Sequence, residues 1–107
     1  MVENPFNVTI KVGEVKRAEE FSEARKPNMC KLWIDLGSKK VQSAAQLLYH
    51  HSVEELVGKQ VLCATDLGEV NIAGFDSQVL TVGVPDEDGN PVLVTPEKKV
   101  PNGGLLY

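Results

Sequence analysis

Cysteine is scarce in this sequence, and long apolar runs are absent. Cys30 and Cys63 are the only cysteines, and they lie too far apart for the paired spacing of a zinc site. No stretch approaches the roughly 18 apolar residues of a membrane span. Residues 1–5 also lack the basic start and apolar run of a signal peptide. These absences predict a cytoplasmic protein without membrane insertion, with two reduced core thiols and no metal or other cofactor.

Residues arranged for catalysis are also sparse. The two histidines, His50 and His51, are adjacent, so their side chains point apart in either a helix or a strand. No serine lies in a Gly-x-Ser-x-Gly turn. The carboxylates of residues 86–88 do not have the spacing of a calcium loop. We therefore expect no enzymatic activity.

Basic residues are concentrated in the first half of the chain. Residues 1–59 contain nine Lys or Arg and eight Asp or Glu, whereas residues 60–107 contain two and seven. The net charge of −4 is unusual for a general nucleic-acid binder, whose domain is normally basic. Any contact with a polyanion is therefore expected from the first half. A solvated surface of mixed sign explains the same composition without a polyanion.

Apolar and polar residues alternate along much of the chain. Residues 8–15 and 32–36 follow this period of two, which is typical of strands. Trp33 falls opposite Leu32 and Ile34, which places it on the outer face or in a second apolar contact. Further strand candidates are Val41, residues 61–64, residues 78–82 and residues 92–94. Without a linker, residues 1–107 form one domain, a small all-β barrel or sandwich.

Local signals also predict one short helix. Ser52 and Glu55 have the spacing of a capping box, in which each side chain bonds the other's backbone amide. Gly58 supplies a left-handed stop. A second helical turn is expected at residues 45–49. One or two short helices between the third and fourth strands match the order of a five-stranded OB-fold barrel.

Several segments, taken in order, resemble the tRNA-binding domains of the OB-fold class, in particular the CsaA-like secretion chaperones. These segments are residues 18–27, 31–37, 42–46, 54–61, 72–80 and 100–103. The resemblance implies an OB barrel that forms a homodimer through its terminal segments. The corresponding residues here are Pro5, Phe6, Leu105 and Leu106. The alternative is a terminal strand that packs on its own barrel.

The resemblance also implies a nucleic-acid or peptide site. It would lie on the strand pair after the charged loop of residues 18–27, on the loop after the fourth strand and at the start of the fifth. The residues at these places are Lys31, Gln42, Ser43, Ala44, Gln46, Asp66 and Ser77. Small residues at positions 43–45 suit a groove for a flat base, but a tight strand-to-helix corner needs the same residues. The two glutamines offer amide donors and acceptors.

The sequence departs from the family pattern at residues 66–71. Relatives have a neutral amide, prolines and basic residues there, whereas this chain has Asp66 and Glu69. Because these carboxylates repel phosphate, we expect weak tRNA binding. The expected role is that of an export-related chaperone that binds unfolded or preprotein peptide segments. The alternative is an accessory or assembly module that uses the barrel as a structural subunit.

Overall fold

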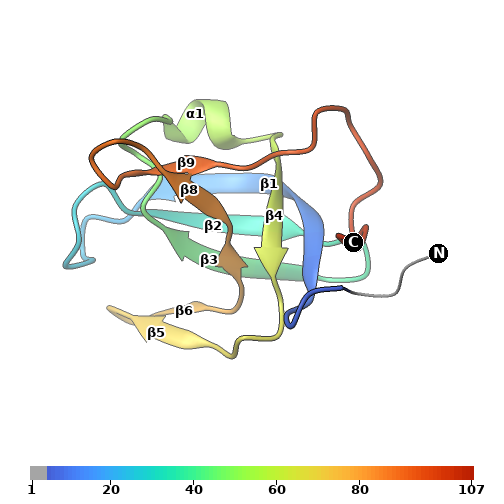
Figure 1. Ribbon diagram of the computed structural model, residues 1–107. Helices are drawn as coiled ribbons and strands as arrows, with labels where there is room; N and C mark the ends of the chain where they lie inside the picture. Colours follow the sequence, from blue (N-terminus) through green and yellow to red (C-terminus); the bar gives the residue numbers. More distant parts are fainter. Residues whose placement is uncertain (1–4) are drawn as a thin grey trace.

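A curled five-stranded antiparallel sheet forms a nearly closed barrel in the computed structural model, which describes residues 5–107 (Figure 1). The strands of this sheet are, in spatial order, β3 (Lys40–Ala45), β2 (Cys30–Asp35), β1 (Ile10–Glu20), β4 (Gln60–Ala64) and β7 (Leu80–Thr81). The predicted OB-fold barrel is therefore confirmed.

Two small hairpins extend from this barrel. The first consists of β5 (Val70–Ile72) and β6 (Phe75–Ser77), and the second of β8 (Gly83–Pro85) and β9 (Pro91–Leu93). Of these four strands, β9 was expected from residues 92–94 and part of β6 from the resemblance, which places Ser77 at the start of the fifth strand; β5 and β8 were not expected. Within residues 5–107, no helix has the length and apolar character needed to cross a bilayer.

The barrel interior is filled by the apolar side of the predicted alternation. On β2, Cys30, Leu32 and Ile34 point inward and are buried, whereas Lys31 and Trp33 lie on the outer face and are only partly buried. Cys30 and Cys63 are both free and buried. Burial raises the pKa of the Cys30 thiol to about 11 and that of Cys63 to about 12, so both stay protonated at neutral pH.

The predicted helix is present as α1 (Val53–Leu56), between β3 and β4. The Ser52 hydroxyl accepts a hydrogen bond from the Glu55 amide at 3.2 Å, and the Ser52 amide donates to the Glu55 carboxylate at 2.7 Å. These two bonds confirm the capping box. The helix places one fully buried residue, Leu56, in the barrel core. Burial of this side chain stabilises the folded protein by about 2 kcal/mol. The second helical turn expected at residues 45–49 does not form a helix: Ala45 ends β3, and residues 48–50 form a turn in which the His51 amide donates to the Leu47 carbonyl.

The first strand is longer than the sequence indicated. The charged loop was expected to begin at Ala18, but β1 continues to Glu20, because its second half pairs with β2. A bulge between Val15 and Arg17 shifts the register, and the first half of β1 pairs with β4 instead. This irregularity breaks the simple alternation. The connecting loop, called the β1–β2 loop below, therefore consists of residues 21–29.

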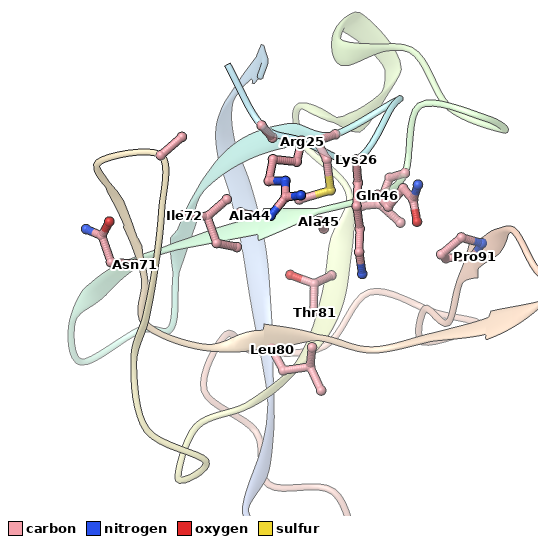
Figure 2. A pocket seen from close by; sticks show the side chains of 14 residues that line it. Arg25, Lys26, Ala44, Ala45, Gln46, Asn71, Ile72, Leu80, Thr81 and Pro91 are labelled. Atoms are coloured by element: carbon pink, nitrogen blue, oxygen red, sulfur yellow. The ribbon is translucent and has the colours of Figure 1, made fainter. Parts of the chain in front are cut away.

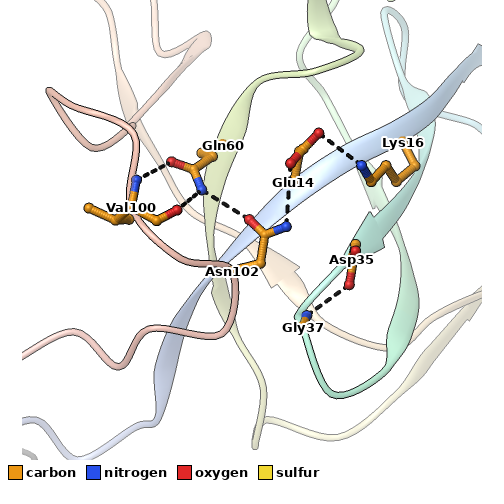
Figure 3. A network of polar contacts seen from close by, with 7 residues as sticks. All are labelled: Glu14, Lys16, Asp35, Gly37, Gln60, Val100 and Asn102. Carbon is orange, nitrogen blue, oxygen red and sulfur yellow. Dashed lines mark hydrogen bonds and ion pairs between the residues drawn. The ribbon is translucent and has the colours of Figure 1, made fainter.

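Residues 100–106, here called the C-terminal strap, bind to the protein's own β1. The amides of Gly103 and Leu106 donate to the carbonyls of Val12 and Ile10, and the Val12 amide donates to the Gly104 carbonyl. Figure 3 shows the side-chain network that holds the strap: Gln60 bonds both the amide and the carbonyl of Val100, and Asn102 bridges Gln60 and Glu14. Hydrogen bonds from Lys16 and then Asn102 lower the pKa of Glu14.

Candidate nucleic-acid interface

The β5–β6 hairpin covers part of the outer face of β2 and β3. Phe75 on this hairpin packs edge-on against Phe21 and against Trp33, with ring centroids 5.6 Å apart in both pairs. The Lys31 ammonium lies over the rings of Phe21 and Phe75, at 4.8 and 5.4 Å, and the Arg17 guanidinium lies over Trp33 at 4.5 Å. Trp33 therefore belongs to a second apolar cluster outside the barrel.

A pocket of about 580 Å³ opens beside this cluster (Figure 2). One wall comes from the β1–β2 loop, with Arg25, Lys26 and Met29, and another from the hairpin residues 71–73. Residues 44–47, at the end of β3, lie between these walls. In an OB fold, ligands bind on the face of the second and third strands, between the β1–β2 loop and the loop before the last strand. The pocket occupies the position that this geometry gives to a ligand.

The side chains around the pocket combine apolar surface with positive charge. Arg25 and Lys26 extend over it in Figure 2, and the residues that line it include no Asp or Glu. Among residues 5–107, neither cation has a carboxylate within ion-pair distance. Met29, Ala44 and Ile72 supply apolar surface. The electrostatics favour an anionic ligand with an apolar part.

Three of the site residues predicted from the sequence lie at or beside this pocket. Ala44 and Gln46 line it, and the Gln46 side-chain amide donates to the Pro27 carbonyl at 3.0 Å, joining the end of β3 to the β1–β2 loop. Lys31 lies on the neighbouring strand, over the aromatic cluster. Lys31 is therefore placed beside the pocket rather than among its lining residues.

Three other predicted site residues are engaged in closing the barrel between β3 and the β6–β7 segment. The Gln42 side chain donates to the Asp76 carbonyl at 2.9 Å, and the Ser77 hydroxyl accepts from the Ala44 amide at 3.0 Å. Ser43 is fully buried, and its hydroxyl donates to the Val79 carbonyl at 3.0 Å. β3 and β7 share no regular ladder of backbone hydrogen bonds, so these side-chain hydrogen bonds connect the two edges of the sheet.

Asp66, the remaining predicted residue, is used elsewhere. Both of its carboxylate oxygens lie 3.0 Å from the Thr9 amide, so the side chain anchors the residue that precedes β1. Neither Asp66 nor Glu69 lines the pocket. Neither carboxylate therefore belongs to the pocket lining, where repulsion of a phosphate was expected.

Arg25 and Lys26 were not predicted from the sequence as site residues. The only available signal was that they form a basic pair inside the charged loop. Ile72, Leu80 and Pro91 were missed as well. Ile72 and Pro91 approach the pocket from the two hairpins, and Leu80 approaches it from β7.

The histidines lie in the segment between β3 and α1. His50 Nε2 is 2.6 Å from an Asp86 carboxylate oxygen, which joins this segment to the β8–β9 turn. Burial lowers the pKa of His51, although Glu55 opposes this effect, and His51 Nε2 has no partner among the described residues. Residues 5–107 contain no group of three His, Cys, Asp or Glu side chains placed to hold a metal ion.

Comparisons with known proteins agree with this fold. Residues 10–104 match the family model described as a putative tRNA binding domain. The crystal structure of the chaperone CsaA from Bacillus anthracis superposes with a TM-score of 0.87 at 33% identity, over 94% of this chain and 91% of that one. The structure of the CsaA chaperone protein from Picrophilus torridus gives a TM-score of 0.85 at 31% identity, over 94% and 92%.

Curated relatives include much longer proteins. The methionine–tRNA ligase of Methanococcus aeolicus is 31% identical over 99 residues, which are 92% of this chain. The chain spans only 14% of the length of that enzyme. The match to residues 10–104 covers most of the chain, and the chain belongs to the tRNA-binding domain family.

Proposed function

We propose that this protein binds structured RNA of the tRNA class, through the pocket between the β1–β2 loop and the β5–β6 hairpin. The observation that carries the proposal is the pair Arg25 and Lys26, unpaired by any carboxylate of residues 5–107, over an apolar pocket free of acidic lining residues. Membership of the tRNA-binding domain family supports it. The role is one of binding rather than chemistry, and it belongs to the cytoplasm.

The position of Asp66 and Glu69 bears on the expected strength of RNA binding. Weak RNA binding was expected because Asp66 and Glu69 were placed at the site. Asp66 instead binds the Thr9 amide and neither residue lines the pocket, which supports RNA binding at this place despite the two carboxylates. The Lys31 ammonium, held over two rings beside the pocket, adds a third positive charge to this side of the barrel.

The test is a titration with bulk tRNA across a range of salt concentrations. Replacing both Arg25 and Lys26 by alanine is expected to weaken binding at least tenfold and to reduce the log–log salt slope by about two units, one per lost phosphate contact. Lys39→Ala with Lys40→Ala is the matched control, because these two lysines lie at the opposite end of β3 from the pocket. Equal losses in the two double variants would contradict the proposed site.

Binding of an unfolded or preprotein peptide segment is the second candidate function, in the manner of an export-related chaperone. The apolar side chains of the pocket favour it, and two structural neighbours are CsaA chaperones. In the same experiment, an extended apolar peptide that binds without salt dependence, while tRNA does not bind, would support this candidate.

The proposed functional unit is a homodimer formed through the chain ends. Leu105 is 45% exposed and Tyr107 is 76% exposed, although the strap that carries Leu105 is bonded to its own barrel. Pro5 and Phe6 are also exposed, and Leu106 lies beside the start of β1. Exposed apolar side chains at both ends of the chain support an interface there.

Leu105→Glu is expected to convert the dimer into a monomer, because it adds a charge to an apolar interface without removing a buried side chain. Light scattering measures the mass. Val84→Glu, at an equally exposed valine on β8, is the control and is expected to leave the mass unchanged. A parent protein of monomer mass, or a dimer that survives Leu105→Glu, would refute this arrangement.

A further inference from the structure

The outer sheet face is closed to an extended nucleic-acid strand by the protein's own aromatic side chains. OB folds that follow single strands stack successive bases on exposed aromatic rings along a groove. In this barrel, Phe21 and Phe75 are buried in the cluster with Trp33, and no aromatic side chain lines the pocket. A run of stacked bases therefore has no platform in this part of the structure.

The remaining opening has the size of a site for one small ligand. Its volume of about 580 Å³ falls within the range of roughly 300–1,000 Å³ that is typical of pockets enclosing a small molecule. Met29, Ala44 and Ile72 form apolar walls, and the small side chain of Ala44 leaves the space between them open. A flat, largely apolar group fits these walls better than a charged backbone does.

The positive charge lies at the same opening. Arg25 and Lys26 reach over the pocket from the β1–β2 loop, as Figure 2 shows. A guanidinium plane stacks on bases as aromatic rings do, and an ammonium neutralises a phosphate as a point charge. A nucleotide combines a flat base with an attached phosphate, which matches this pairing of apolar walls and cations.

We infer that the pocket takes a single unstacked base of a folded RNA, with the flanking phosphates at Arg25 and Lys26. The inference rests on the proposed RNA-binding function and adds that the ligand is an unpaired nucleotide rather than the backbone of a duplex. The wall residue Ala44 decides access to the pocket. The cationic pair sets the affinity for the phosphates on either side.

Two hairpin RNAs test this inference. They have the same stem, and one carries a single bulged 2-aminopurine whereas the other is fully paired. The protein is expected to prefer the bulged hairpin by about tenfold, because burial of the unpaired base against the apolar walls removes one of its faces from water. The emission of the bulged base is expected to change on binding.

Ala44→Phe fills the pocket and is expected to abolish the preference for the bulged hairpin over the paired one. Binding of the paired hairpin shows that the variant is folded. Arg25→Lys keeps the charge but removes the stacking plane, so it is expected to reduce the preference while the salt slope stays the same. If Ala44→Phe does not fold, Arg25→Lys decides the question.

The outcomes separate the inference from the function on which it rests. Equal affinity of the parent for both hairpins, with steep salt dependence, would overturn the inference and leave RNA binding standing. An unchanged preference in both variants would also overturn it. No binding of either hairpin or of tRNA at low salt would overturn both, as would binding of an extended peptide alone.

Discussion

Replacement of Gly103 by alanine is expected to lower the free energy of unfolding by about 3 kcal/mol. Gly103 has φ +91°, a conformation that costs an alanine about 1–2 kcal/mol. In addition, a Cβ atom at this position would lie 2.4 Å from the backbone carbonyl oxygen of Leu36. Backbone atoms cannot rotate away as a side chain does, so the strap must move. Such a shift would break the bond from the Gly103 amide to the Val12 carbonyl.

Gly68→Ala is the matched control for this prediction. Gly68 has φ +87°, but a Cβ atom there would meet no atom within 4 Å. The control therefore measures the backbone strain alone, about 1 kcal/mol. Urea unfolding of both variants gives the comparison. Equal losses would mean that the strap tolerates displacement and that its contact with the β2–β3 turn contributes little.

The features predicted correctly from the sequence are those that depend on neighbours in the chain. The capping box of Ser52 and Glu55 needs residues three apart, and the structure has both of its bonds. The alternation in residues 32–36 determines the inward face of β2, because a strand has a period of two. Assignment of the barrel to the OB class also needed the resemblance, because the periodicity alone left a sandwich open.

The features that were missed depend on contacts between distant residues. The β5–β6 hairpin contains only three residues in each strand, and its place is set by the packing of Phe75 on Phe21 and Trp33. No local pattern indicates that packing. The extension of β1 to Glu20 likewise follows from its pairing with β2 across the bulge.

The candidate site shows the same division, with one exception. Ala44 and Gln46 were located because the strand that carries them was located, whereas the approach of Arg25 and Lys26 depends on how the β1–β2 loop folds over the pocket. Ser43 is the exception: it was predicted to be a site residue, although the alternation of the strand already indicated that it is buried. It lies two residues after Val41, on the same inward face, so alternation placed its hydroxyl inside the barrel.

Ser43→Ala is therefore expected to weaken folding rather than ligand binding. The Ser43 hydroxyl accepts a hydrogen bond from Thr81 at 2.9 Å and donates to the Val79 carbonyl at 3.0 Å. After the substitution the Val79 carbonyl keeps the Ser77 hydroxyl as a donor, but the buried Thr81 hydroxyl loses its acceptor. The expected loss in the free energy of unfolding is about 2 kcal/mol. Ser38→Ala, at an exposed serine, is expected to change it by less than about 0.5 kcal/mol.

A double variant identifies the cause of this loss. Thr81→Val removes the hydroxyl that Ser43→Ala leaves without a partner, so the two substitutions together are expected to cost about 1 kcal/mol less than the sum of the single effects. tRNA binding by Ser43→Ala, measured well below its unfolding temperature, is expected to stay within about twofold of the parent, because a fully buried hydroxyl cannot reach a ligand. Weaker tRNA binding without a loss of stability would instead return Ser43 to the binding surface, and the barrel would have to open between β3 and β7 to expose it.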